Sequence, residues 1–330
     1  MYHINLIIDN IKIVNYFTLK YLGEKMIKIG VIGAGRWGTN HIRVLSELSK
    51  EQPNKLMFTA ICDIDISKAL NLAKTYNIPH VFSDIFEFSK HVDAAVIATP
   101  IETLSNVALK MIDRGKHVLI EKPAAITSKD IIMLEDFAKK KDAVVGVGYI
   151  MRFTSVIDFI KPSLTKFSPI FILFRRFSRR VEHIKKIHIV FDLAVHDIDL
   201  CLYLTDADSW KLEYAKIFHT DIDDSVISVL KVKDLYCNIH VDGVSLHKVR
   251  EIDIVGTKAF VRGNIIEDTI MIKWDNGEFN VLKLQDEEPL KKELKSFIEA
   301  IELRKYGKLA NLSDAFKVLK IVEEIMNYTT

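Results

Sequence analysis

Asp192 and His196 lie four residues apart in an apolar stretch of the chain. On an α-helix this spacing places both side chains on one face, so that they can point into a common site. Histidine titrates near neutral pH and is the natural group to accept a proton from a hydroxyl. A neighbouring carboxylate can orient the ring or hold a substrate hydroxyl. The pair is therefore a candidate catalytic pair, although a buried structural histidine and an aspartate at a helix start would give the same pattern.

A metal site is an alternative for this segment, because Asp197 and Asp199 add two carboxylates to it. On a helix these two residues turn away from the face that Asp192 and His196 share. We therefore predict no metal at this position.

A glycine-rich motif, Gly33-Ala34-Gly35-Arg36-Trp37-Gly38, follows a predicted strand and opens a predicted helix. Its first glycine makes a tight turn, its second lets the backbone approach a pyrophosphate, and its third lets helix and strand pack closely. The phosphates would lie at the positive N-terminus of the helix. We expect all three glycines, with Arg36 and Trp37 between them, to bind a dinucleotide.

Asp63 ends the next predicted strand, 25 residues after Gly38, close to the spacing of about 20 expected for a ribose-binding carboxylate. A carboxylate there accepts hydrogen bonds from the ribose diol and repels a 2′-phosphate. We therefore predict NAD as the cofactor in preference to NADP.

Glu121-Lys122-Pro123 comes at the carboxyl end of another predicted strand, where open α/β sheets bind their ligands. A lysine beside a dinucleotide can contact both ribose and substrate, and its charge would stabilise an alkoxide that forms during oxidation. An ordinary surface lysine before a turn proline is the alternative interpretation.

These residues need a scaffold of alternating strands and helices, and the first half of the chain predicts one. Five buried strands are expected at 28–32, 58–62, 94–98, 117–120 and 143–147, and amphipathic helices between them at 37–48, 67–76, 104–114 and 128–140. Such alternation is typical of a parallel, doubly wound sheet. We assign residues 26–150 to a dinucleotide-binding Rossmann domain.

Residues 151–330 have a different pattern and are predicted to form an α+β domain with an open, mostly antiparallel sheet. Longer strands are expected at 170–176, 226–232, 236–241, 251–255 and 270–274, with turn sequences at Asp242-Gly243 and Asn276-Gly277. Helices are expected at 191–204 and between 290 and 328.

Composition excludes several classes of protein. The 46 basic and 44 acidic residues give a net charge of +2, whereas proteins that coat nucleic acid are strongly basic. A hydrophobic content of 49% argues against disorder. We expect no membrane span and no signal peptide, and we interpret residues 1–25 as an N-terminal extension. Three scattered cysteines predict neither disulfides nor a zinc site, which favours a cytoplasmic protein.

Taken together, the motifs resemble the Gfo/Idh/MocA family of oxidoreductases. The resemblance extends from Lys28 to the last helix. It is carried by the glycine-rich motif, Thr99-Pro100, Glu121-Lys122-Pro123, Gly148-Tyr149-Ile150-Met151-Arg152-Phe153 and Asp192-x-x-x-His196.

The resemblance implies roles for individual residues. The family's catalytic lysine falls on Lys122, its active-site aspartate on Asp192 and its general base on His196. Thr99, Pro100, Glu121 and Lys122 are then expected beside the cofactor, and Arg152 beside the substrate. A cis Lys122–Pro123 bond and an open sheet that makes contacts within a homodimer or homotetramer are also implied.

Within the family, the segments 35–44 and 248–257 look most like nucleotide-sugar dehydrogenases that oxidise the 3-hydroxyl of UDP-N-acetylglucosamine. Basic residues before the Asp192 segment agree with a diphosphate, which guanidinium groups bind bidentately; they are Arg175, Arg176, Arg179, Arg180, Lys185 and Lys186. We expect Arg176 and Arg179 to bind substrate, although a solvated charged loop would have the same composition.

The sequence thus predicts an NAD-dependent oxidoreductase of a nucleotide sugar. Two alternatives remain open at this point. One is a dehydrogenase of a free polyol or monosaccharide such as inositol or glucose. The other is a non-catalytic sensor that binds dinucleotide, which would have no need for Lys122, Asp192 and His196 together.

Overall fold

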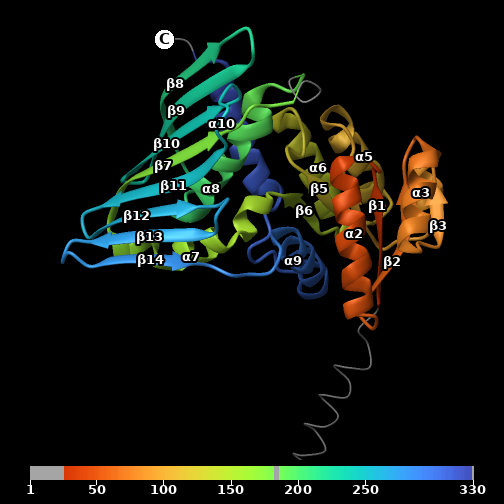
Figure 1. Ribbon diagram of the computed structural model, residues 1–330. Helices are drawn as coiled ribbons and strands as arrows, with labels where there is room; N and C mark the ends of the chain where they lie inside the picture. Colours follow the sequence, from red (N-terminus) through yellow and green to blue (C-terminus); the bar gives the residue numbers. More distant parts are fainter. Residues whose placement is uncertain (1–25, 182–185, 329–330) are drawn as a thin grey trace, which may run out of the picture.

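The computed structural model describes residues 26–181 and 186–328. The predicted N-terminal extension, Lys185 and the last two residues lie outside this part of the chain. Two β-sheets stand side by side, with the C-terminal helices between them (Figure 1).

The first sheet has six parallel strands in the order β3-β2-β1-β4-β5-β6. Its strands are β1 (Ile27–Ile32), β2 (Leu56–Cys62), β3 (His80–Phe82), β4 (Ala94–Ile97), β5 (His117–Glu121) and β6 (Val145–Gly148). Helices α2 (Arg36–Glu51), α3 (Ile66–Tyr76), α4 (Ile85–Ser89), α5 (Ile101–Asp113) and α6 (Ser128–Lys141) connect them. This is a doubly wound order, in which ligands bind at the carboxyl ends of the neighbouring strands β1 and β4, where the strand order reverses.

Hydrophobic patterning explains why these elements form. Ile29 and Val31 of β1 are buried, as expected for a strand covered on both faces. Helix α2 buries Ile42, Leu45 and Leu48 at helical spacing. The prediction missed β3 and α4, which at three and five residues are too short to show a hydrophobic period.

The second sheet has eight strands in the order β14-β13-β12-β11-β7-β10-β9-β8. They are β7 (Pro169–Phe177), β8 (Lys211–His219), β9 (Asp224–Val232), β10 (Leu235–Asp242), β11 (Val249–Gly256), β12 (Ala259–Asn264), β13 (Thr269–Trp274) and β14 (Phe279–Lys283). Only β7 and β10 pair in parallel. The predicted open, mostly antiparallel sheet is confirmed.

The two predicted turn sequences behave differently. Asn276-Gly277 closes the β13–β14 hairpin, with Gly277 at φ +92°. Asp242-Gly243 ends β10, but the next strand, β11, pairs with β7 instead.

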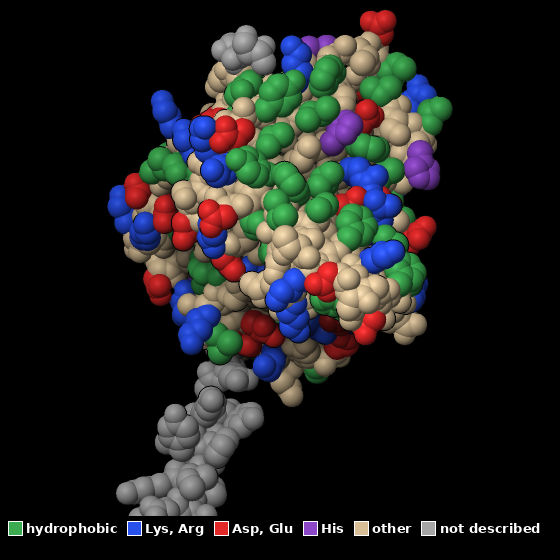
Figure 2. Space-filling view, turned by 90° about the vertical axis from the view of Figure 1, so that its left-hand side faces the viewer, with side chains coloured by type: hydrophobic (Ala, Val, Ile, Leu, Met, Phe, Trp, Pro, Cys, Tyr) green, Lys and Arg blue, Asp and Glu red, His purple; other side chains and the backbone are tan. Residues whose placement is uncertain are grey.

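The two faces of this sheet have different surroundings. Ile252 and Ile254 of β11 are buried on the side of the helices. The opposite side is open, and hydrophobic side chains gather near its centre (Figure 2). Phe171 and Val255, which are register partners in β7 and β11, are both exposed.

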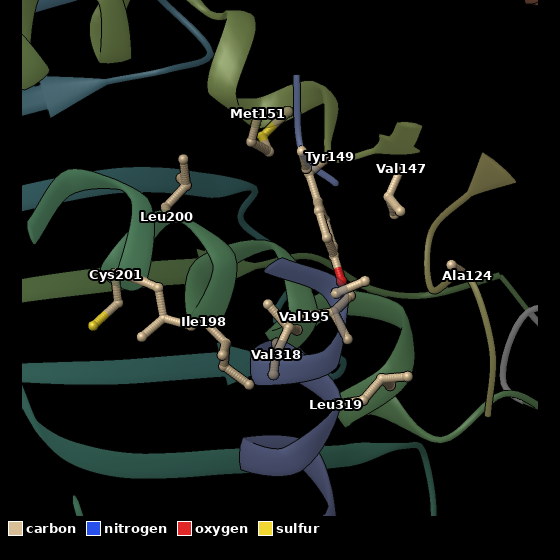
Figure 3. Packing of buried hydrophobic residues seen from close by; sticks show 14 of the residues in the cluster. Ala124, Val147, Tyr149, Met151, Val195, Ile198, Leu200, Cys201, Val318 and Leu319 are labelled. Atoms are coloured by element: carbon tan, nitrogen blue, oxygen red, sulfur yellow. The ribbon is translucent and has the colours of Figure 1, made fainter. Parts of the chain in front are cut away.

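Helices pack between the two sheets. They are α7 (Ser155–Ser163), α8 (Val195–Thr205), α9 (Pro289–Leu303) and α10 (Leu312–Met326), with 3₁₀ turns η1 (Ile150–Phe153) and η2 (Leu164–Phe167) and a π-helical turn η3 (Val190–Ala194). Helices α7, α8 and α10 share one hydrophobic core with both sheets, and α9 packs in a second core with the first sheet. Tyr149, Val195 and Val318 approach one another in the shared core (Figure 3). Helix α8 is thereby fixed relative to the first sheet. Within the described ranges, no helix is both long and apolar enough to cross a membrane.

Candidate active site

The glycine-rich loop between β1 and α2 is shaped by contacts that only glycine allows. Gly33 has φ +100°, and a Cβ there would lie 2.4 Å from the Ala98 carbonyl oxygen. A Cβ on Gly38 would lie 1.7 Å from the carbonyl oxygen of Gly33. Around Gly35 no atom lies within 4 Å of that position, and no side chain caps α2. The loop therefore offers open space and free amides to a pyrophosphate.

A pocket of about 650 Å³ adjoins this loop at the carboxyl ends of the strands. Its lining includes Gly33, Gly35, Asp63, Thr99 and Pro100. The size and position fit the adenosine half of a dinucleotide, and the open cradle at Gly35 fits its phosphates. Arg36 and Trp37 are exposed in the first turn of α2.

Asp63 is held by backbone amides of the same region. Its Oδ2 accepts a hydrogen bond from the Ala34 N–H (2.5 Å), and its Oδ1 accepts one from the Asp65 N–H (2.8 Å). The carboxylate thus links the end of β2 to the glycine-rich loop. Lys68 lines the same pocket and pairs with Asp65 at 3.4 Å.

Lys122 follows β5 directly, and its bond to Pro123 is cis, as the family resemblance implied. Glu121 before it pairs with the buried His41 of α2, with 2.7 Å between Glu121 Oε1 and His41 Nε2. The Lys122 ammonium donates to the Asp192 carbonyl oxygen (2.6 Å) and lies 3.4 Å from Asp192 Oδ1. Burial lowers the pKa of Lys122, and the Asp192 carboxylate opposes that change.

Asp192 connects two cations. Its second oxygen, Oδ2, lies 3.5 Å from Nη1 of Arg180. Arg180 itself is buried and forms a bidentate pair with Asp223, at 2.6 and 2.8 Å. Sequence analysis placed Arg180 in a basic stretch without a site role, and its partner Asp223 has no signal in the sequence.

His196 is half-buried in the first turn of α8. Its Nδ1 is enclosed and has no hydrogen-bond partner among the described residues. Burial lowers the pKa of His196 well below its usual value, and the charges of Lys122, Arg176 and Arg250 lower it further. The ring is therefore neutral at pH 7 and able to accept a proton.

The predicted single helix over 191–204 is wrong in its first turn. Asp192 belongs to the π-helical turn η3, whereas His196 belongs to α8. The four-residue spacing of an α-helix therefore does not describe how the Asp192 and His196 side chains are placed relative to each other. The carboxylate of Asp192 interacts with Lys122 and Arg180.

The structure does not support substrate binding by Arg152 and Arg176. Arg152 is 4% exposed and pairs with Asp199 and Asp314. Arg176 is 3% exposed and pairs bidentately with Asp197 at 2.7 and 2.8 Å. Because these pairs already occupy both guanidinium groups, a diphosphate would have to break buried ion pairs, which is costly.

Arg179, the third predicted substrate residue, is exposed beyond the end of β7. Asp197 and Asp199, which the metal alternative required, are used in the two arginine pairs. The part of the chain that the structure describes contains no group of three or more His, Cys, Asp or Glu side chains able to hold a metal ion.

The part of the chain that forms the first sheet and its helices is similar to known proteins. Residues 27–149 match the family model described as "Oxidoreductase family, NAD-binding Rossmann fold" of the GFO_IDH_MocA group. The UDP-N-acetylglucosamine 3-dehydrogenase of Acidithiobacillus ferrooxidans is 26% identical over 182 residues, 55% of each chain. The myo-inositol 2-dehydrogenase of Thermotoga maritima is 24% identical over 277 residues, 76% of this chain and 80% of that protein.

The fold of the whole described chain also has a close counterpart. The solved structure of the Acidithiobacillus ferrooxidans UDP-N-acetylglucosamine 3-dehydrogenase superposes with a TM-score of 0.81 at 21% identity, covering 91% of this chain and 97% of that one. In sequence, however, this chain spans only about half the length of that relative.

Proposed function

We propose that this protein is an NAD-dependent dehydrogenase that oxidises a secondary hydroxyl of a sugar, since residues 27–149 match the Gfo/Idh/MocA oxidoreductase family model. The observation that carries the proposal is the approach of Lys122, at the carboxyl end of β5, to Asp192 next to helix α8. This contact brings the dinucleotide-binding half and the His196 helix to one site.

The chemistry divides among three side chains. NAD, which Gly33, Gly35 and Asp63 would hold, would supply the acceptor for the hydride of the carbinol carbon. His196 accepts the hydroxyl proton. We assign Nε2 as the accepting atom because Nδ1 is enclosed. The Lys122 ammonium stabilises the developing alkoxide. Asp192 holds that ammonium through a hydrogen bond and favours its charged form, because its carboxylate opposes the lowering of the Lys122 pKa by burial.

We also propose NAD over NADP, because the Asp63 carboxylate faces the pocket that fits adenosine. A 2′-phosphate would meet this carboxylate. Turnover with NADP equal to that with NAD would contradict the proposal.

The substrate we propose first is UDP-N-acetylglucosamine, oxidised at its 3-hydroxyl. The support is the sequence similarity to a 3-dehydrogenase of that sugar. The second candidate is a free polyol, favoured by the longer match to an inositol dehydrogenase. For assembly, we propose a homodimer or homotetramer that covers the apolar centre of the open sheet.

The test is NAD reduction by purified protein, followed by nicotinamide absorbance. The substrates are UDP-N-acetylglucosamine, UDP-glucose, glucose and inositol, each with a carbonyl reagent that removes the ketone. Reduction with UDP-sugars alone supports the first candidate, and reduction with free sugars alone supports the second. Unchanged NAD with every sugar, in a protein that binds NAD, would favour the sensor alternative.

A further inference from the structure

Two arginines lie side by side on the helix-covered face of the second sheet. Arg176 of β7 and Arg250 of β11 are direct partners in the antiparallel register. Side chains alternate along a strand, so Arg250 shares its face with the buried Ile252 and Ile254. Both arginines stand at the edge of the site, where β7 ends and β11 begins.

The two arginines differ in their partners. The guanidinium of Arg176 donates two hydrogen bonds to the Asp197 carboxylate. The half-buried guanidinium of Arg250 makes no hydrogen bond or ion pair with any side chain in the described ranges. A partly buried charge without a partner is unfavourable, so this position favours an anion from outside the chain.

The ion pairs around the site lead to the same conclusion about Arg250. Lys122 has Asp192, and Arg180 has Asp223. Arg176 has Asp197, the residue next to His196. Among the described residues Arg250 forms no ion pair. Its charge lowers the pKa of His196, and the Asp197 carboxylate partly opposes the lowering of the pKa of Arg250 itself.

We propose that Arg250 binds an anionic group of the substrate, a phosphate or a carboxylate, close to the hydroxyl that His196 deprotonates. A guanidinium group can donate two parallel hydrogen bonds to either a phosphate or a carboxylate. The proposal rests on the proposed function in one respect only, namely that the bound anion belongs to the sugar being oxidised. It narrows the substrate to anionic sugars and disfavours neutral polyols such as inositol.

Arg250 takes the role that the sequence suggested for Arg176, whereas Arg179, the other arginine suggested for it, is exposed beyond the end of β7. The basic stretch before Asp192 contains Arg176 and Arg180, both of which are held by aspartates. Arg250 lies far from that stretch in sequence and reaches the site because β11 pairs with β7.

The first experiment measures anion binding without turnover. The full chain, loaded with NAD, is titrated with inorganic phosphate at constant ionic strength, and its melting temperature is followed. Three variants are compared with the wild type: Arg250→Gln, Arg250→Lys, and Lys273→Gln as a control. Lys273 is exposed on another strand of the same sheet, so its replacement removes the same charge away from the site.

We expect phosphate to stabilise the wild type and Lys273→Gln alike. Arg250→Gln should bind it about 10- to 100-fold more weakly, as for loss of a hydrogen bond to a charged group. The phosphate affinity of Arg250→Lys should fall between those of the wild type and Arg250→Gln, because lysine keeps the positive charge but loses the bidentate guanidinium geometry. Equal phosphate binding by wild type and Arg250→Gln, or no binding by the wild type, would overturn the proposal. Folding is checked by the melting temperature without phosphate, and Arg250→Lys provides the test if Arg250→Gln unfolds.

A second titration identifies the source of the anion. UDP-N-acetylglucosamine, glucose 6-phosphate and glucuronate are compared with neutral N-acetylglucosamine and inositol. The compound whose affinity depends most on Arg250 carries the fitting anion, and equal losses for charged and neutral sugars would overturn the proposal.

Failure of this inference can be separated from failure of the dehydrogenase proposal. Phosphate binding through Arg250 without NAD reduction by any sugar would contradict only the dehydrogenase. Oxidation of inositol, unchanged in Arg250→Gln, would contradict only the anion site.

Discussion

Lys122 donates a hydrogen bond of 2.6 Å to the backbone carbonyl oxygen of Asp192, 70 residues further along the chain. The contact joins the end of β5 to the π-helical turn η3. Burial favours the neutral amine of Lys122, and the Asp192 carboxylate favours the ammonium. Among its neighbours Asp192 opposes the effect of burial most strongly, Glu121 acts in the same direction, and Arg176 acts against them.

Replacing Asp192 with Asn should shift the pH dependence of the enzyme. Without the carboxylate the pKa of Lys122 falls further, so the alkaline limb of kcat/KM moves to lower pH. We expect activity at pH 8 to drop at least about 10-fold, the usual effect of losing a hydrogen bond to a charged group. Asp208→Asn, which breaks the exposed pair with Lys317, is the control. An alkaline limb that stays in place would show that Asp192 does not control Lys122.

His196→Ala should remove the proton acceptor. We expect kcat to fall about 10²- to 10⁴-fold, with NAD affinity nearly unchanged. Because the pKa of His196 is lowered, the wild type should remain active at a lower pH than an ordinary histidine would allow. Steady-state kinetics over a pH series and NADH fluorescence check both points, with the exposed His219→Ala as a control. Full activity of His196→Ala would exclude it as the base.

Asp63→Ser should weaken the binding of NAD. Loss of the carboxylate is expected to raise the KM for NAD about 10- to 100-fold, and NADP should be affected less because a repulsive charge has gone. The ratio of kcat/KM for the two cofactors is the measurement. A ratio that does not move would contradict the role of Asp63, provided that the melting temperature shows an intact fold.

The glycine-rich loop offers a matched pair of substitutions. Gly38→Ala pushes a methyl group into the carbonyl of Gly33 and should destabilise the fold by about 3 kcal/mol or more. Gly35→Ala meets nothing within 4 Å and should leave stability unchanged. It should nevertheless weaken NAD binding about 10-fold or more, because the methyl group enters the space of the pyrophosphate. Urea unfolding and NADH titration separate the two effects, and tight NADH binding by Gly35→Ala would disprove this loop assignment.

Glu293 of α9 should make stability depend on pH. Its carboxyl is fully buried and finds no hydrogen-bond partner in the part of the chain that the structure describes, and burial raises its pKa well above the usual value. The folded state keeps the proton that the unfolded chain releases above about pH 4.5. Stability is therefore complete below that pH and declines as the pH rises toward the folded pKa, by about 1.4 kcal/mol per unit.

Glu293→Gln should remove this decline. The urea midpoints of wild type and variant are compared at pH 5 and pH 8, with the exposed Glu299→Gln on the same helix as a control. An identical pH slope in wild type and Glu293→Gln would show that Glu293 is not the titrating group.

Local sequence determined much of this protein. The alternation of buried strands and amphipathic helices predicted the first sheet, because each element shows its own hydrophobic period. The glycines at 33, 35 and 38 and the lysine at 122 were also predictable, since turns and strand ends have strong local signals. The family resemblance added the cis bond at Pro123 and pointed to Asp192 and His196.

Tertiary structure alone decided which charges meet. Arg176 was expected to bind a diphosphate, but Asp197 lies close enough to neutralise it. Arg180 pairs with Asp223, whereas Arg250 pairs with no carboxylate of the described residues. The sequence around an arginine looks the same whether or not its guanidinium pairs with a carboxylate in the folded protein. The difference depends on which strands are neighbours, and β7 lies beside β11 only in the folded sheet.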